Sequence, residues 1–79
     1  MEASNLEPGE LYVCRVFPSD RVSPIYRRNY AGKTAIYLSF VPDYEEHYGD
    51  VYPRWKFLID GELRYMPEGF LKHLDLPDV

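Results

Sequence analysis

The stretch RWKFLIDGELRYM, residues 54–66, decides the fold of this chain. Asp60-Gly61 lies between two runs of alternating apolar residues. An Asp-Gly pair in that position is a strong signal for a β-hairpin, because both central residues of a type I′ turn need a positive φ. The turn also sets the register and places Ile59 opposite Glu62. This register predicts one core face, made by Trp55, Phe57, Ile59 and Met66, with Leu58 and Leu63 on the opposite face.

Two segments upstream of this hairpin also have the pattern of strands. LYVCRVF, residues 11–17, is rich in β-branched and aromatic residues and is followed by Pro18, and TAIYLSFV, residues 34–41, alternates along its length. Downstream, Pro67 ends the hairpin, and PEGFLKHL, residues 67–74, predicts one helical turn and a short last strand. We expect the core face of the segment 34–41 to consist of Ile36, Leu38 and Phe40.

The segments between the strands carry most of the turn-forming residues. Residues 18–33 predict a long irregular arm, with a short two-stranded ribbon around residues 25–30 as an alternative. PDYEEHYGDVYP, residues 42–53, is expected to be a loop, and a helical turn opened by Pro42 is the alternative there. Residues 1–79 are expected to form a single domain, with flexible tails at 1–9 and 75–79.

Charge is distributed unevenly along the chain. The 79 residues have a net charge of −4 and a pI of about 5.0, which is the opposite of the balance in a general nucleic-acid binder. Residues 42–53 contain four acids and no Lys or Arg, whereas residues 21–33 contain no acid. The basic residues of this second segment, called the basic arm below, are Arg21, Arg27, Arg28 and Lys33.

The cysteine and hydropathy patterns point to a cytoplasmic protein. Cys14 is the sole cysteine, so an internal disulfide is impossible and a zinc site of several cysteines is excluded. A reducing, intracellular setting fits this composition best. The first residues do not form a secretory signal, and no apolar run approaches the roughly 20 residues that span a bilayer. We therefore expect no membrane partner.

The ordered features of residues 54–71 resemble the last third of SH3 domains. That family runs from a tryptophan pair through a tight hairpin to a proline, a single 3₁₀ turn and an aromatic residue. Trp55 matches the second tryptophan, Gly61 the hairpin glycine, Pro67 the proline and Phe70 the aromatic ending. The resemblance implies an all-β, five-stranded SH3-like small barrel with one short helical turn near the C-terminus.

The resemblance extends upstream in topology, over about residues 10–75. Residues 18–33 take the place of the RT arm of SH3 domains, and residues 42–53 take the place of the n-Src loop. The chain departs from the family in the groove that holds proline-rich peptides. Arg54 stands at the first tryptophan position, Gly69 stands at the asparagine position, and the arm is basic where the family uses acids. The groove residues that stay in place are Pro67, Phe70 and Tyr12.

These departures imply an SH3-like shape with most of the peptide-binding chemistry missing. Small SH3-like barrels also occur as stand-alone proteins in bacteria and phages, where they bind other proteins or nucleic acids. This chain is similar to them in size and simplicity. The leading hypothesis is therefore a non-enzymatic protein-interaction module, a small phage or bacterial accessory protein that binds and modulates a larger partner.

The tyrosine-rich acidic segment is the predicted contact surface. Tyrosine offers a large contact area at low entropic cost, and acids steer a basic partner. The alternative interpretation is that the tyrosines pack on the barrel and the acids solvate a loop. The predicted partner-binding residues are Tyr44, Glu45, Glu46, Tyr48, Asp50, Tyr52 and Arg54.

The runner-up hypothesis is a nucleic-acid-associated barrel that uses the basic arm. Basic side chains interleaved with tyrosines can hold phosphates and stack on bases. The residues for this role are Arg27, Arg28, Tyr30 and Lys33.

Catalysis and metal binding have little support in the sequence. Glu46, His47 and Asp50 could approach a divalent ion, but no second histidine stands at ligand spacing. No nucleophile and oxyanion-donor set accompanies His47. Cys14 is interpreted as a small core residue. We therefore expect no enzyme activity, no metal and no cofactor.

Overall fold

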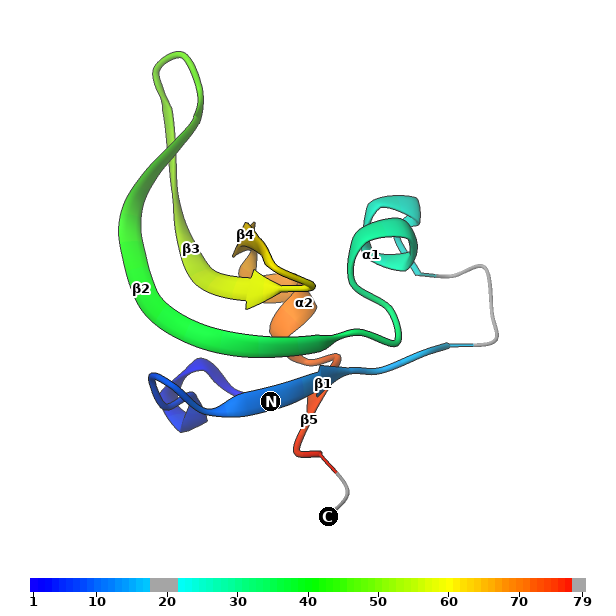
Figure 1. Ribbon diagram of the computed structural model, residues 1–79. Coiled ribbons are helices and arrows are strands. Elements are labelled where there is room, and N and C mark those ends of the chain that lie inside the picture. The colour runs from blue at the N-terminus through cyan, green and yellow to red at the C-terminus, as the bar shows by residue number, and fades with distance from the viewer. Residues whose placement is uncertain (18–21, 78–79) are drawn as a thin grey trace.

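The chain forms one antiparallel five-stranded sheet (Figure 1). The computed structural model describes residues 1–17 and 22–77. Three predictions fall partly or wholly outside these residues: Arg21, the first residues of the arm at 18–33, and the last residues of the tail at 75–79. The sheet order is β4-β3-β2-β1-β5, so a four-stranded meander is followed by a last strand that returns to β1. The strands are β1 (Leu11–Cys14), β2 (Thr34–His47), β3 (Asp50–Ile59), β4 (Glu62–Met66) and β5 (Leu74–Asp75).

Three short helices complete the described chain: η1 (Ala3–Asn5), α1 (Pro24–Asn29) and α2 (Glu68–Leu71). The predicted all-β class is therefore confirmed, and so is the order of one helical turn and a last strand after Pro67. The first strand is shorter than the segment 11–17 and ends at Cys14.

The β3–β4 hairpin has the predicted turn and register. Asp60 and Gly61 both have positive φ, 55° and 79°. Ile59 pairs with Glu62, and Trp55 pairs with Met66. The core residues expected from this register are 0–6% exposed: Trp55, Phe57, Ile59 and Met66.

The prediction for the core face of β2 is wrong. Ala35 and Tyr37 are buried, whereas Phe40 is 46% exposed. Ala35 pairs with Tyr12 on one side and Ile59 on the other, so its small side chain lies between two large core residues. Alternation alone does not say which of two apolar faces points inward, and here the face with Tyr37 does.

The prediction of a loop or helical turn at residues 42–53 is also wrong. Both strands continue through it, and the hairpin turns at Tyr48-Gly49, where Gly49 has φ 84°. The pairing shifts register between Tyr37 and Ser39, between Val41 and Tyr44, and between Glu45 and His47. Such bulges bend a strand and increase its twist, which fits the long curve of β2 in Figure 1.

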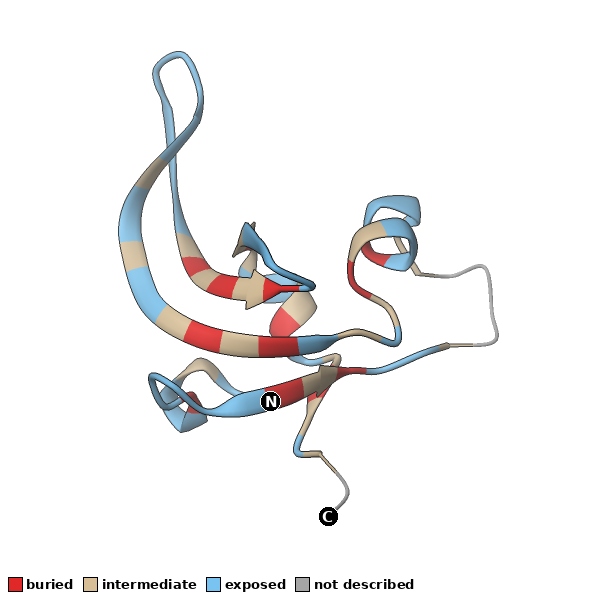
Figure 2. Cartoon of the chain, viewed as in Figure 1, coloured by how far each residue is buried: buried red, intermediate tan, exposed pale blue. Residues whose placement is uncertain are grey.

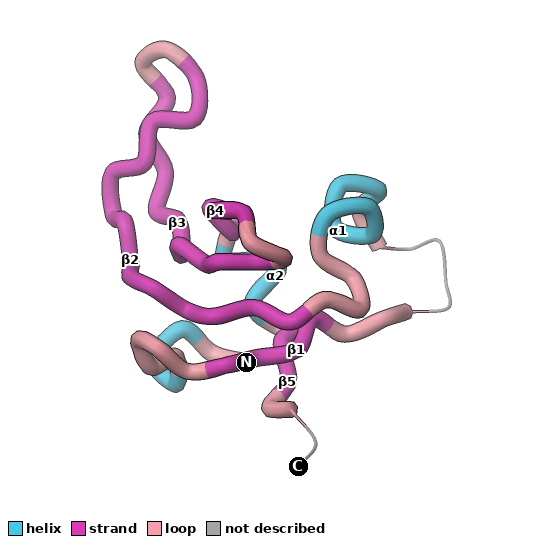
Figure 3. The backbone as a smooth tube through the Cα atoms, viewed as in Figure 1, coloured by secondary structure: helices cyan, strands magenta, loops and turns pink. Residues whose placement is uncertain are grey.

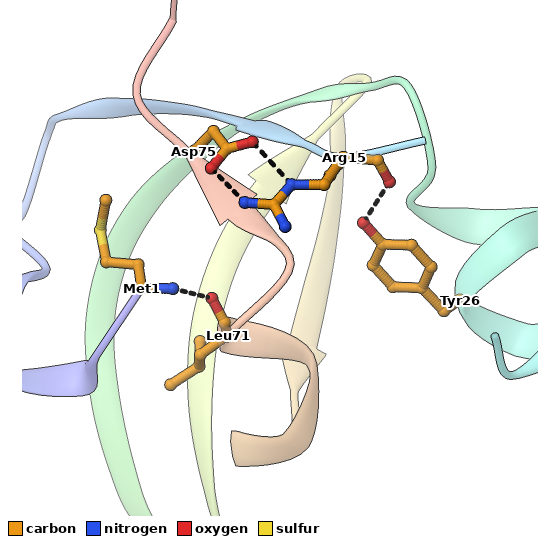
Figure 4. A network of polar contacts seen from close by, with 5 residues as sticks. All are labelled: Met1, Arg15, Tyr26, Leu71 and Asp75. Carbon is orange, nitrogen blue, oxygen red and sulfur yellow. Dashed lines mark hydrogen bonds and ion pairs between the residues drawn. The ribbon is translucent and has the colours of Figure 1, made fainter. Parts of the chain in front are cut away.

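The arm at residues 18–33 contains a helix where an irregular arm or ribbon was predicted. The Ser23 hydroxyl accepts a hydrogen bond from the backbone N–H of Ile25 (3.2 Å), and Pro24 opens α1. The helix buries Tyr26 completely. Its hydroxyl donates to the backbone carbonyl of Arg15 over 2.7 Å, which fixes α1 to the chain just after β1 (Figure 4).

Polar contacts also fix the two ends of the described chain (Figure 4). Arg15 donates to both carboxylate oxygens of Asp75, from Nε over 2.9 Å and from Nη2 over 2.6 Å. The amino group of Met1 donates to the carbonyl of Leu71 over 2.8 Å. Leu6 is buried in the core, so the segment before β1 packs on the sheet. The mobility of the tails and the single-domain organisation stay predictions.

Candidate functional site

Residues 41–54, called the ribbon below, extend beyond the rest of the sheet (Figure 3). The Cα pairing of β1 with β2 covers residues 34–36, and that of β4 with β3 covers residues 55–59. The strands of the ribbon therefore pair only with each other. Figure 2 shows that this part of the sheet is mostly exposed. Because an isolated two-stranded hairpin is marginally stable in water, side-chain contacts must help to hold it.

One face of the ribbon supplies those contacts. The ring of Tyr44 stacks on Tyr65 of β4, with centroids 4.2 Å apart and planes 15° apart. Arg54 donates from Nη2 to Glu46 Oε2 (2.8 Å), and its guanidinium lies 5.1 Å from the ring centroid of Tyr52. The side chain of Arg54 is only 14% exposed. We call the surface made by Tyr44, Glu46, Tyr52 and Arg54 the anchored face.

On the anchored face Tyr44 and Arg54 are half-buried, whereas Glu46 and Tyr52 are exposed, and so are the remaining predicted contact residues. Tyr48 at the turn is 100% exposed, and Glu45 and Asp50 are exposed on the paired strands. Within residues 1–17 and 22–77, neither Glu45 nor Asp50 forms an ion pair, and the same is true of Asp43. The tip of the ribbon therefore presents one tyrosine among acids that the described chain leaves unneutralised.

Sequence reasoning missed the apolar residues on the second face of the ribbon. Phe40 pairs with Trp55, with ring centroids 4.9 Å apart, and Val51 is 52% exposed. Alternation along β3 places Pro53 and Val51 on the same face as Trp55. Phe40 was assigned to the core with Ile36 and Leu38. The register shift between Tyr37 and Ser39 instead brings Phe40 onto the face of Tyr37 and Trp55, at the margin of the core, and no signal in the sequence marks that shift. A shallow hollow of about 370 Å³ beside this face is lined by Ala3, Ser4, Tyr37, Phe40 and Trp55.

The structure separates the residues of the basic arm. Arg27 and Arg28 are exposed on α1, and Lys33 lies 3.8 Å from the Asp60 carboxylate. Tyr30 is 5% exposed, and its ring lies 5.6 Å from that of Phe70. Burial raises the pKa of the Tyr30 phenol. Its ring is not available to stack on a base, so a nucleic-acid surface would depend on the three cations alone.

The aromatic residues left from the peptide groove are buried to different extents. Tyr12 is 2% exposed, and its hydroxyl accepts a hydrogen bond from the backbone N–H of Glu7 over 2.9 Å. The ring of Phe70 contacts Tyr26 and Tyr30, both from the segment of α1, and Phe70 is half-buried. The ring of Tyr12 is therefore closed to a proline-rich peptide, whereas part of Phe70 faces the solvent.

Chemically reactive groups are not assembled in the described part of the chain. Outside residues 18–21 and 78–79, no three residues among His, Cys, Asp and Glu are placed to hold a metal ion. Cys14 is 0% exposed, and burial raises the pKa of its thiol to about 11, so the neutral thiol dominates near pH 7. No helix in the described ranges has the length and apolar character to cross a bilayer.

Comparisons with protein-family models, with curated proteins and with solved structures find no match to this chain.

Proposed function

We propose that this chain is a small, non-enzymatic protein-interaction module that contacts its partner through the ribbon. The observation that supports this proposal is the projection of the ribbon beyond the sheet, with Tyr48 fully exposed at its tip. Exposed acids surround that tyrosine, and such a combination suits a partner with a basic surface.

The anchored face prepares the ribbon for binding. The stack of Tyr44 on Tyr65 and the contacts of Arg54 restrict the ribbon before a partner arrives. A surface that is ordered in advance loses less entropy on association. In this proposal Tyr44, Glu46, Tyr52 and Arg54 position the ribbon, and Glu45, Tyr48 and Asp50 meet the partner.

The fold supports a more specific proposal, an SH3-like barrel. The meander of β1 to β4 and the return of β5 to β1 resemble the order expected for that family. The burial of Tyr12 argues against recognition of proline-rich peptides. We therefore propose that the chain belongs with the stand-alone SH3-like accessory proteins of bacteria and phages, and that it works in the reducing cytoplasm that a single buried cysteine suits.

Affinity capture followed by mass spectrometry tests the ribbon. The tag belongs at the C-terminus, because the Met1 amino group donates to Leu71. We expect Tyr48→Ser and Asp50→Lys to reduce recovery of the partner about tenfold. Glu7→Lys, an exposed acid outside the ribbon, is the matched charge control and should leave recovery unchanged. Equal recovery with both ribbon variants would rule out the ribbon as the interface.

The second candidate is nucleic-acid association, favoured by the exposure of Arg27 and Arg28 on α1. Binding of single-stranded DNA or RNA would fall steeply with salt, because each phosphate contact releases a counterion. Arg27→Glu and Arg28→Glu should abolish such binding and leave protein capture intact. Salt-dependent binding that both variants lose would favour this candidate over the first.

A further inference from the structure

The face of the ribbon opposite the anchored face continues the core face of the sheet. At each register shift between β2 and β3 the extra residue lies in β2, so β3 alternates without interruption. Trp55 belongs to the core, and Pro53 and Val51 project from the same side of β3. Phe40 pairs with Trp55 and therefore joins them. We call Phe40, Val51, Pro53 and Trp55 the apolar face.

The apolar face leaves the core and becomes exposed towards the turn of the ribbon. Phe40 is 46% exposed and Val51 is 52% exposed, whereas Trp55 is 6% exposed. At its inner end, Phe40 and Trp55 line the hollow of about 370 Å³ together with Ala3 of η1. A row of exposed apolar side chains that leads into a hollow suits an apolar side chain of a bound molecule.

An acid marks the other end of the apolar face. Glu45 pairs with Val51 and therefore projects from the same side of the ribbon. It is exposed and forms no ion pair within residues 1–17 and 22–77, and the same holds for its neighbours Asp43 and Asp50. The apolar face and the lining of the hollow contain no Lys or Arg. A cation on a bound molecule would therefore meet carboxylates that are not neutralised.

We propose that the apolar face binds an extended segment of a partner protein that carries an apolar anchor residue and a Lys or Arg further along. This inference rests on the proposed function and names the chemistry of the partner. The anchor enters the hollow beside Trp55, and the cation meets Glu45. From Trp55 to Val51, at about 3.4 Å per residue, β3 covers roughly 14 Å. An extended segment covers this distance in about four residues, which sets the spacing of anchor and cation.

Charge favours this occupant over the alternatives. A second copy packed on this face would bring its own Glu45 into the contact, and the chain has a net charge of −4. An acidic segment would meet the same repulsion. A segment with an anchor and a cation satisfies both ends of the face.

Selection from a displayed library of random peptides of about 12 residues, which reach roughly 40 Å when extended, tests the proposal on the full chain. Enriched peptides should share a large apolar residue and a Lys or Arg about four positions away, in either direction. A synthetic copy of an enriched peptide that lacks tryptophan is then titrated into the chain. Because Trp55 is the sole tryptophan, its fluorescence reports occupation of the hollow.

Variants of the face should weaken this peptide. We expect a loss of about fivefold for Val51→Ser and at least tenfold for Phe40→Ser, because each removes apolar contact area. Glu45→Lys should also weaken it at least tenfold by repelling the cation. The matched controls lie on β4 and should leave the affinity unchanged: Leu63→Ser, because Leu63 is 51% exposed, and Glu62→Lys, because Glu62 is exposed. Circular dichroism checks each fold, and Val51→Ser carries the test if Phe40→Ser unfolds.

Several outcomes would overturn the proposal. They are a library that yields no binder, enriched peptides that are acidic or lack the paired features, and equal affinity for wild type, Val51→Ser and Glu45→Lys. A wild-type dimer in sedimentation velocity that Val51→Ser abolishes would also overturn it, because the occupant would then be a second copy.

Partner capture separates this inference from the proposed function. If Tyr48→Ser loses the partner while Val51→Ser and Phe40→Ser keep it, the ribbon stands as the interface and the segment proposed here does not. If all of these variants and Asp50→Lys keep full capture, both proposals are wrong.

Discussion

The hydroxyl of Tyr26 is the best place to measure what α1 contributes to stability. Tyr26 is 0% exposed, and its hydroxyl donates to the Arg15 carbonyl over 2.7 Å. Tyr26→Phe removes this hydrogen bond and keeps the ring, which packs on Phe70 and His73. A typical net hydrogen bond is worth about 0.5–1.5 kcal/mol, and the carbonyl left behind is then unsatisfied. We therefore expect the free energy of unfolding to fall by about 1–1.5 kcal/mol.

Urea denaturation followed by fluorescence measures this change, because Trp55 is the sole tryptophan and is 6% exposed. With a slope of about 1 kcal/mol/M for a small domain, the midpoint should fall by about 1 M while the slope stays the same. The melting temperature should fall by roughly 4–8 °C for each kcal/mol. Tyr48→Phe is the matched control, because Tyr48 is 100% exposed, and it should change nothing. Equal midpoints for wild type and Tyr26→Phe would refute the reasoning.

Burial of the Tyr26 phenol should also make the free energy of unfolding fall at high pH. Burial raises the pKa of the Tyr26 phenol above its ordinary value of 10.0. Below pH 10 the phenol is neutral in both states, so its contribution is fully present. As the pH rises above 10, the unfolded chain releases a proton that the folded chain keeps, and stability falls. Tyr26→Phe should lose less stability than the wild type between about pH 9 and pH 11.

Three further predictions concern single residues. Burial, followed by Lys72 and other cations, lowers the pKa of His73 below 6.5. Stability should therefore be full above pH 6.5 and fall as the pH drops below it, and His73→Gln should flatten this dependence in urea titrations. Cys14 should react with a thiol reagent only after unfolding, because it is buried and the pKa of its thiol is raised to about 11. Gly61→Ala should lower the free energy of unfolding by about 1–2 kcal/mol, because alanine disfavours the φ of 79° at this position. The added methyl group meets no atom within 4 Å, so no steric clash adds to this cost. Denaturation midpoints of the variant and the wild type would check this.

The parts of the fold that were predicted correctly depend on local chemistry. The Asp60-Gly61 turn demands positive φ at both positions, and this demand fixed the register of β3 and β4. Pro67 cannot continue the ladder, which placed the end of β4. These signals act within a few residues, so one sequence is enough to find them.

The errors arose where distant residues decide the structure. Whether Ile36 or Tyr37 points to the core depends on pairing with β1 and β3. A register shift that no local residue signals then returns Phe40 to the face of Tyr37, at the margin of the core. Acids and prolines at residues 42–53 suggested a loop, because such residues are rare in central strands. They are tolerated here because, within the described ranges 1–17 and 22–77, no third strand pairs with the ribbon.

The exposure of the predicted site residues also depends on distant contacts. Tyr44, Tyr52 and Arg54 were assigned to the partner, but Tyr65, twenty-one positions from Tyr44, stacks on the Tyr44 ring. Glu45, Tyr48 and Asp50 stay exposed because the turn at residues 48–49 points away from the sheet. Composition singled out the segment, only the pairing showed which of its side chains face the solvent, and their role in binding stays a prediction.

The two prolines of the ribbon have a consequence for aggregation. The open edges of two paired strands are a template on which strands of other molecules can add. Pro42 and Asp43 lie opposite Pro53 in the irregular pairing between Val41 and Tyr44, and neither proline has an N–H group to offer. Prolines, bulges and exposed charges at a strand edge all disfavour strand addition, so the ribbon is a poor template for an intermolecular sheet. A partner that binds the ribbon is therefore expected to contact its side chains rather than to add a strand to its backbone.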